Sequence, residues 1–579
     1  MIFWYVRTGM KKGQEYSGIV KQVRFPNKGV VCVPGEDDRC IVKNTVAGQK
    51  VRFRVDKKRN GSCEGYLLDI EERSPLEIDS PCPHFEQCGG CTYQTLSYSE
   101  QLKLKEEQVH ELLDAVITGG ADTEVDIKSL YEPIISSPVQ FEYRNKMEFS
   151  FGDASLGGDL ELGLHKRGSF YDIITVGNCR IVDDDYRSIL SETLSYFRGK
   201  ETTYYHKRTH EGFLRFLVIR KAAATSEILI DLVTTSQLPK DTICTEVSLL
   251  EDWKESLLSL KLSGKIVGIL HTTDDSVSDA IINERTDLLF GRDYFNEEVL
   301  GLSFKITPFS FFQTNTLSAE VLYSKVREYV SMAVGSDENN AGRVKTVYDL
   351  YSGTGTIGQL MSTVADQVIG VEIVEEAVKA ANENARLNGL HNCRFIAGDV
   401  LKVLDEIEEK PDLIILDPPR DGINPKALAK IARYGVDNII YVSCKPTSLA
   451  RDLEYLMANG YSPVRICPID QFPATVHVEC VVLLTQRKPD MSIEITMTEE
   501  DLELTRAEAK ATYKEITDYV QTKYGLRVPN LYVAQVKREF GIIERENYNK
   551  GKEGHQIPQV TPEKREAIID ALRFYKMIV

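Results

Sequence analysis

The stretch Val347-Tyr348-Asp349-Leu350-Tyr351-Ser352-Gly353-Thr354-Gly355-Thr356-Ile357-Gly358 decides the fold of this chain. An apolar strand end runs into Gly-x-Gly-x-x-Gly and then into a predicted helix, and glycines at such a turn let the backbone approach a ligand closely. Glu372 ends the next apolar run, where a carboxylate can hold ribose hydroxyls. The pattern predicts an α/β domain that binds a nucleotide-type cofactor.

Two acidic positions favour S-adenosylmethionine over a dinucleotide. Asp349 lies four residues before the first glycine, where it can meet the amino acid end of a methionine. Asp417 follows the apolar run Ile414-Ile415-Leu416 and opens an Asp-Pro-Pro turn at a later strand end. Ligands of open parallel sheets collect at the carboxyl ends of the strands, so both carboxylates are expected at one site.

Cys444 lies between the apolar strand 438–442 and a predicted helix. The free N–H groups and the dipole of that helix, together with Lys445 and Arg451, are expected to favour the thiolate, which is the nucleophilic form. A small buried apolar residue is the alternative interpretation of a single cysteine. The neighbouring motifs Asp-Pro-Pro-Arg at 417–420 and His-Val-Glu at 477–479 favour the nucleophile.

With these motifs, the chain resembles the uracil-C5 RNA methyltransferases of the 23S rRNA type, which carry a TRAM domain and an iron–sulfur cluster. The resemblance covers roughly residues 12–487 and includes the segment Phe311-Phe312-Gln313-Thr314-Asn315. It implies Cys444 as nucleophile, Glu479 as base, and a set of cofactor-binding residues: Gln313, Tyr351, Thr356, Glu372, Asp399 and Asp417. Lys445 and Pro419 depart from residues that other members of the family carry, and we interpret both as subfamily variation that touches no reacting atom.

The implied reaction follows from the electronics of uracil, whose C5 is too weak a nucleophile to take a methyl group unaided. Addition of the Cys444 thiolate to C6 makes C5 reactive, and C5 then takes the methyl group of the cofactor. Glu479 removes the C5 proton so that the cysteine can leave. The target base must be flipped out or lie in a loop.

The sequence Cys82-x5-Cys88-Gly-Gly-Cys91 places three thiols close together in a charged chain. Such spacing is typical of a metal site that needs a fourth ligand, and four thiolates permit either zinc or an iron–sulfur cluster. The family resemblance supplies Cys179 as that ligand and implies a structural [4Fe–4S] cluster.

Composition bounds the remaining possibilities. The chain has 579 residues, 42% hydrophobic and 27% charged, which suggests about three to five domains. No apolar run approaches the roughly 18 residues that span a bilayer, so we expect a soluble cytoplasmic monomer without a membrane partner. The net charge of −17 does not exclude RNA, because a local basic face steers a polyanion.

Four regions are predicted. Residues 12–72 read as short strands of a small TRAM or OB-like β-barrel, with one cationic strand face for RNA: Lys50, Arg52, Arg54, Lys57, Lys58 and Arg59. Residues 73–310 read as an α+β domain with the iron–sulfur site, and residues 311–488 as a Rossmann-like class I S-adenosylmethionine-dependent methyltransferase domain. Residues 489–579 read as a helical extension of unknown role, and residues 333–343 as a mobile linker.

The expected substrate is 23S ribosomal RNA, before full assembly of the subunit. Three alternatives stay open: a tRNA uracil methyltransferase with the same catalytic set, an amino-group methyltransferase, and a noncatalytic iron–sulfur RNA-binding or redox protein. An amino-group enzyme usually has an aromatic residue after Asp-Pro-Pro, where this chain has Arg420.

Overall fold

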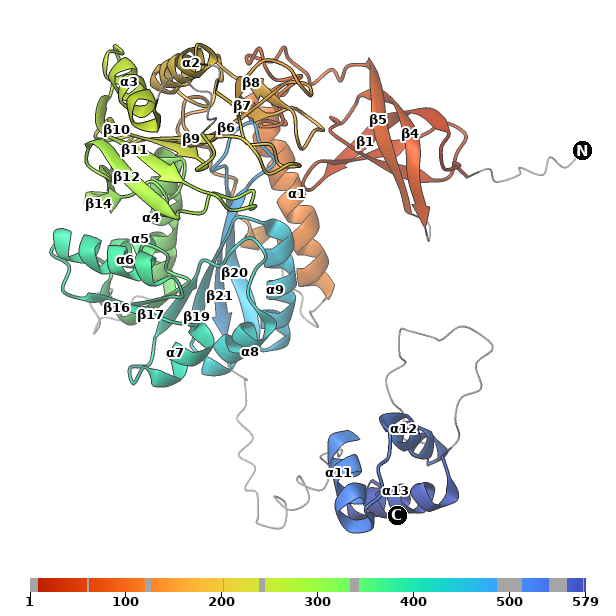
Figure 1. The fold of residues 1–579 in the computed structure, drawn as a ribbon. Coiled ribbons are helices and arrows are strands. Elements are labelled where there is room, and N and C mark those ends of the chain that lie inside the picture. The colour runs from red at the N-terminus through yellow and green to blue at the C-terminus, as the bar shows by residue number, and fades with distance from the viewer. Residues whose placement is uncertain are drawn as a thin grey trace, which may run out of the picture. The chain divides into compact units, whose positions relative to one another are not determined.

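The structure of the chain is a computed structural model (Figure 1). It describes residues 9–59, 62–119, 127–200, 202–238, 245–333, 343–486, 513–540, 560–575 and 577–578. The predicted linker at 333–343 falls almost wholly outside these ranges, as do large parts of the predicted helical extension at 489–579. The chain forms two compact units, residues 1–487 and 488–579.

The first strands close a five-stranded barrel in the order β1-β2-β3-β5-β4, which confirms the predicted small barrel. Alternation along β4 buries Val51, Phe53 and Val55 inside it. The strands are β1 Glu15–Arg24, β2 Lys28–Cys32, β3 Arg39–Lys43, β4 Lys50–Arg59 and β5 Ser62–Glu72.

The predicted cationic face of β4 is largely paired with carboxylates. Arg52 contacts Glu15 at 3.0 Å, and Lys58 contacts Asp38 at 2.6 Å. Lys50 and Lys57 have carboxylate partners on β5. A phosphate that binds here therefore competes with an internal carboxylate, a cost that the sequence pattern does not reveal.

A seven-stranded sheet in the order β12-β11-β10-β9-β6-β7-β8 follows, and only its β10–β11 pair is parallel. Helices α2 and α3 cover one face through Ile189, Leu190 and Trp253. The elements are α1 Tyr98–Gly119, β6 Lys146–Gly152, β7 Glu161–His165, β8 Ile173–Thr175, α2 Asp184–Arg198, β9 Leu214–Lys221, β10 Glu227–Thr234, α3 Glu246–Leu258, β11 Lys265–Thr273 and β12 Arg285–Gly291, with a short helix at Ile127–Leu130.

The second large sheet has the order β17-β16-β15-β18-β19-β21-β20. Its first five strands are parallel, and β20 and β21 pair antiparallel to their neighbours. Chain order reverses between β15 and β18, the position where ligands bind in open α/β sheets. The strands are β15 Val344–Leu350, β16 Ala365–Glu372, β17 Cys393–Ala397, β18 Leu413–Leu416, β19 Asn438–Ser443, β20 Tyr461–Ile469 and β21 Glu479–Gln486.

Helices cover both faces of this sheet. Helices α1, α8 and α9 share a core with Tyr348 and Ile414, whereas α4 and α5 share a core with Val347 and Ile415. A hairpin, β13 Phe295–Val299 with β14 Leu302–Ile306, precedes α4. The helices are α4 Thr316–Ala333, α5 Thr356–Met361, α6 Glu375–Leu387, α7 Val400–Glu406, α8 Pro425–Tyr434 and α9 Pro446–Ala458.

The second unit contains α11 Tyr513–Tyr524, α12 Asn530–Glu539 and α13 Pro562–Phe574. Their apolar faces enclose a small core of their own that includes Ile516, Val533 and Ile568. Among the residues that the structure describes, no helix combines the length and the apolar character needed to cross a bilayer.

One buried ion pair fastens α1 to the loop after β20. Lys105 Nζ lies 2.6 Å from an Asp470 carboxylate oxygen and donates to the Phe472 carbonyl at 3.0 Å, with both charged side chains fully buried. Burial lowers the pKa of Lys105, which Asp470 opposes. On the same helix, Gln101 accepts from the Ala474 N–H at 2.8 Å, so α1 fixes the loop that leads to β21.

We predict that Lys105→Met destabilises the first unit by about 3 kcal/mol, because it leaves the Asp470 charge buried without its cation. The exposed pair Arg394–Glu409 is the matched control, and Arg394→Met should cost less than about 1 kcal/mol. Urea unfolding of the full chain, followed by circular dichroism, measures both. Equal effects of the two substitutions would contradict the assigned role of Lys105.

Candidate active site

The glycine-rich turn after β15 requires left-handed backbone. Tyr351, Gly353 and Gly355 have φ values of 68°, 54° and 72°. A Cβ on Gly355 would lie 2.6 Å from the Phe395 ring, so a side chain at this position is excluded both by conformation and by space. The turn therefore keeps its backbone open at the carboxyl end of the sheet.

Two predicted cofactor residues hold the backbone of this edge. Glu372, at the end of β16, accepts from the Gly353 N–H at 3.0 Å and from the Val374 N–H at 2.9 Å. Asp399 follows β17 and caps α7 by accepting from the Leu401 N–H at 2.9 Å. Both carboxylates are thus oriented by the chain itself.

Tyr351 and Thr356 lie at the two ends of the turn. Burial, followed by the charge of Asp399, raises the pKa of Tyr351 to about 12. Thr356 begins α5 and is buried, with its hydroxyl 3.5 Å from that of Thr354. Thr354 in turn donates to the Phe311 carbonyl at 3.2 Å, which brings the 311–315 segment against the turn.

Asp349 and Asp417 end the neighbouring strands β15 and β18. Asp349 accepts from the Gly358 N–H at 2.8 Å, and its other carboxylate oxygen is buried with no hydrogen-bond partner. Burial raises the pKa of each carboxyl to about 7, and for Asp349 the charge of Asp417 adds to the effect. This edge has an excess of acceptors that suits a cationic ligand.

Gln313 lies in the segment that precedes α4. Its carbonyl accepts from the Asn145 side-chain amide at 2.8 Å, and the same amide donates to the Thr316 hydroxyl at 2.7 Å. Phe311, two residues earlier, exposes 67% of its surface beside the glycine-rich turn. Asn145, directly before β6, thus fixes the segment, and the exposed Phe311 ring lies on its side next to the glycine-rich turn.

Cys444 and Glu479 come together because β21 runs against β19. The start of an antiparallel strand lies at the end of its parallel neighbour, and Ser443 pairs with Cys480. Burial, then the charges of Glu479 and Asp417, raise the pKa of the half-buried Cys444 thiol to about 11. Burial and Asp417 raise the pKa of Glu479 to about 8.

The raised pKa of Cys444 contradicts the prediction that this cysteine is a thiolate. The resting Cys444 is a thiol at neutral pH, because desolvation and two carboxylates outweigh the nearby cations. Arg451 does not stabilise a Cys444 thiolate, because its guanidinium pairs with Asp452 at 2.7 Å and donates to the Asp421 carbonyl. The cation that does lower the Cys444 pKa is Arg420, by charge and by a hydrogen bond.

The site contains two groups that sequence reasoning missed. The sequence analysis gave Arg420 no role toward the sulfur, whereas its guanidinium contacts Cys444 and also lowers the pKa of Glu479. Tyr323, on α4, is buried near Asp417, Glu479 and Asp349, and burial, followed by the charges of these carboxylates, raises its pKa well above normal. Arg420 could have been found from its place in the Asp-Pro-Pro-Arg turn, but nothing in the sequence distinguishes Tyr323 from other helical tyrosines.

The four predicted cluster cysteines line one small cavity. Cys82, Cys88, Cys91 and Cys179 share it with Gln94 and Leu164, and each is almost fully buried. Burial and mutual repulsion raise the pKa of Cys91 to about 12 and that of Cys179 to about 11. Within the described ranges, however, no three cysteine, histidine or carboxylate side chains are close enough to hold a metal ion.

The sheet order, the glycine-rich turn and the acidic strand ends together define a methyltransferase-type α/β domain. The fold is similar to that of the Pyrococcus abyssi tRNA (uracil-54, C5)-methyltransferase solved with S-adenosyl-L-homocysteine, with a TM-score of 0.60 and 23% identity, covering 81% of this chain and all of that one.

Sequence comparison narrows the class. The family model described as tRNA (Uracil-5-)-methyltransferase matches residues 242–487. An uncharacterized RNA methyltransferase of Clostridium tetani is 45% identical over 478 residues, which are 83% of this chain and 99% of the relative. Another, from Caldanaerobacter subterraneus, is 47% identical over 475 residues, with 82% and 99% coverage. The chain belongs to the same family of RNA methyltransferases as these relatives.

The raised carboxyl pKa values predict that the stability of the folded state falls as pH rises. Asp349, Asp417 and Glu479 favour the folded state when protonated, so their contribution is complete below their ordinary values near 4 and is lost as pH rises to about 8. Glu479→Gln should therefore reduce the fall in melting temperature between about pH 5 and about pH 9. The exposed Glu409, whose pKa is lowered, provides the control Glu409→Gln, which should leave that fall unchanged. A fall of the same size in Glu479→Gln and wild type would contradict the raised pKa.

Proposed function

We propose that this protein transfers a methyl group from S-adenosylmethionine to C5 of a uridine in 23S ribosomal RNA, acting as a monomer before subunit assembly is complete. The observation that carries the proposal is the convergence of a thiol, Cys444, and a carboxyl, Glu479, beside the acidic edge formed by Asp349 and Asp417. C5 methylation of uracil needs a nucleophile for C6 and a base for the C5 proton, and this edge offers one of each.

The cofactor end of the site uses the carboxylates in order along the sheet. Glu372 faces the ribose, Asp399 the adenine end, and Asp349 and Asp417 the cationic methionine end, with Tyr351 and Thr356 closing the turn and Gln313 between cofactor and base. The unsatisfied oxygen of Asp349 supports this assignment, because a buried acceptor without a partner is costly until an ammonium group donates to it.

In the proposed reaction the half-buried Cys444 thiol gives its proton to solvent, the thiolate sulfur adds to C6, and the electron pair of the C5=C6 bond moves toward the C4 carbonyl. Arg420 favours the thiolate that this addition requires. C5 then takes the methyl group that S-adenosylmethionine supplies. Glu479 accepts the C5 proton, the double bond re-forms, and the C6–S bond breaks to release the thiolate.

This sequence predicts different failures for the two residues. Glu479→Gln should still form the C6 adduct and transfer the methyl group, so a covalent protein–RNA species should accumulate on denaturing gels while turnover falls by about 100-fold or more. Cys444→Ala should give neither adduct nor 5-methyluridine. Cys32→Ala, a barrel thiol outside the site, is the control and should behave as wild type. Methylation by Cys444→Ala at the wild-type rate, or an adduct on Cys480, would refute the assignment.

Transfer RNA is the second candidate substrate, since both the matching family model and the Pyrococcus abyssi protein are named for tRNA. Offering ribosomal and transfer RNA in the same adduct assay decides between them. An amino-group acceptor is disfavoured by Arg420, because a guanidinium pointed at a thiol leaves no aromatic surface there for stacking. A noncatalytic protein would form no adduct with either RNA.

We further propose that Cys82, Cys88, Cys91 and Cys179 hold a structural [4Fe–4S] cluster. The support is the shared cavity and the mutual repulsion of the thiols, which a cationic centre relieves. A cubane holds its ligands farther apart than one tetrahedral ion does, which is compatible with the absence of a tight three-ligand group in the described part of the chain.

Protein purified without oxygen is therefore expected to be brown and to contain iron and acid-labile sulfide in equal amounts, because a cubane has as many sulfides as irons. Cys88→Ala should lose most of both, whereas Cys32→Ala should keep them. Iron and sulfide analysis together with the visible absorption spectrum make the measurement. Stoichiometric zinc without sulfide would overturn the cluster in favour of the competing metal.

A further inference from the structure

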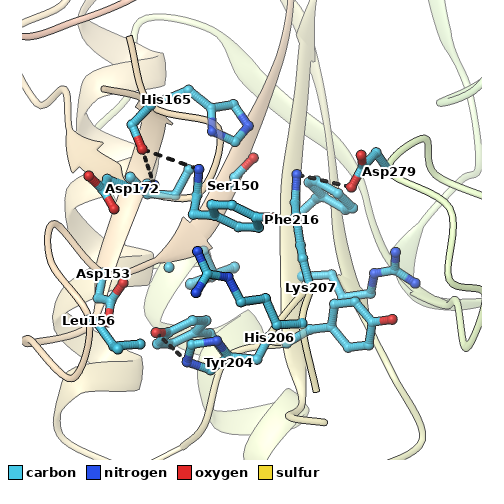
Figure 2. Close-up of a pocket in the computed structure, with 18 residues that line it drawn as sticks. Ser150, Asp153, Leu156, His165, Asp172, Tyr204, His206, Lys207, Phe216 and Asp279 are labelled. Carbon is cyan, nitrogen blue, oxygen red and sulfur yellow. Dashed lines mark hydrogen bonds and ion pairs between the residues drawn. The ribbon is translucent and has the colours of Figure 1, made fainter. Parts of the chain in front are cut away.

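The central sheet carries a pocket of about 260 Å³ that has no part in the site described above (Figure 2). Its walls come from the ends of β6, β7 and β9 and from the segment 204–208. Figure 2 shows His165, Phe216, Tyr204 and His206 around one cavity, with Lys207 and Asp279 at one side. Most of the side chains that line the pocket are aromatic or charged, and Leu156 and Ile173 are the aliphatic ones among them.

The rings of the pocket form flat, neutral surfaces. His165 stacks on Phe170 with centroids 6.1 Å apart and an interplanar angle of 15°. Burial, then the charge of Lys207, lowers the pKa of His165, so its ring is neutral at neutral pH. The Tyr204 hydroxyl is fixed by His206 Nε2 at 2.7 Å. Such surfaces suit the face of a planar heterocycle.

Cations stand at the rim over exposed rings. Lys207 Nζ lies 4.5 Å from the Phe170 centroid, and Arg208 Cζ lies 4.2 Å from that of Tyr171. Phe170 and Tyr171 expose 55% and 48% of their surfaces. Lys207 also pairs with Asp279, whereas the described part of the chain records no carboxylate partner for Arg208. Arg208 is therefore available to a phosphate.

Below the rim the pocket is acidic. Asp153 and Asp172 line it, and Asp153 already accepts from the Gly157 N–H at 2.7 Å. Carboxylates repel a phosphate but accept hydrogen bonds from the amino groups of bases. The buried Arg215 also lines the pocket, where Asp274 balances its charge at 2.9 Å and the Tyr205 ring centroid lies 4.4 Å away.

We propose that this pocket binds one unpaired nucleotide of the substrate RNA, with its base inside and its phosphate at Arg208. The acceptors on Asp153 and Asp172 favour adenine, cytosine or guanine, which carry an exocyclic amino group, over uracil. The proposal rests on the proposed RNA-modifying function and adds to it a second contact that selects and positions the strand.

Strand β6 connects the pocket to the active site. At its start, Asn145 donates to the Gln313 carbonyl, and five residues later Ser150 pairs with Phe216 in the pocket wall. At about 3.3 Å per residue, the two points lie about 17 Å apart along one rigid strand. One RNA segment that places its target uridine near Gln313 can therefore place a neighbouring unpaired base in the pocket.

The test is binding of short oligoadenylate to the full chain carrying Tyr171→Ala and Arg208→Ala together. The dissociation constant should rise about tenfold or more, and the salt dependence of binding should fall by about one counterion, because one stacked ring and one phosphate contact are lost. Oligouridylate binding should change less. Arg285→Ala with Phe290→Ala, an exposed arginine and aromatic on β12, is the matched control and should leave affinity unchanged.

Unchanged oligoadenylate affinity in the pocket variant would overturn the proposal, as would an equal loss in the β12 control. Binding of free AMP to the wild type as tightly as oligoadenylate would also overturn it, in favour of a free nucleotide ligand. The readout is independent of the reaction: Cys444→Ala should bind oligoadenylate as wild type does. Failure of the pocket variant to lose affinity while 5-methyluridine still forms rejects the pocket alone, whereas methylation by Cys444→Ala rejects the reaction scheme alone.

Discussion

The desolvation of three carboxyl groups at one edge of a sheet is the constraint on which this structure depends. Asp349, Asp417 and Glu479 lie where apolar strands end, so each is removed from water next to another acid. A folded protein tolerates this arrangement by leaving protons on the groups or by bringing cations to them. Arg420 supplies part of that charge from within the chain, and a sulfonium cofactor supplies more when it binds.

The rest of the first unit supports that edge mechanically. Lys105 and Gln101 on α1 hold the loop before β21, Asn145 at the start of β6 holds the segment of Gln313, and Glu372 holds the glycine-rich turn. These supports come from parts of the chain that are far apart in sequence. The central sheet therefore contributes to the candidate site, because Asn145, directly before β6, fixes the segment of Gln313.

The sequence predicted the type of fold better than the electrostatics of the site. The barrel strands, the turn at 353–358 and the acidic strand ends follow from local alternation and from glycine chemistry, which are short-range properties. The state of Cys444 was predicted wrongly, because its pKa depends on Glu479 and Asp417, which lie next to it only after folding. The pairing of the basic face of β4 was missed for the same reason. Its carboxylate partners lie on other strands of the barrel, so the sequence of β4 alone does not show them.

The pairing of β19 with β21 sets the distance between Cys444 and Glu479, although 34 residues separate them in the chain. Because side chains alternate along a strand, a slip of one residue would exchange Glu479 for Val478 or Cys480 at the sulfur. The register of the β19–β21 pair thus determines which side chain lies next to the Cys444 sulfur. Length changes in the turn at Asn459 and Gly460 leave this pairing intact, whereas a single insertion within either strand moves the Glu479 carboxyl away from the sulfur.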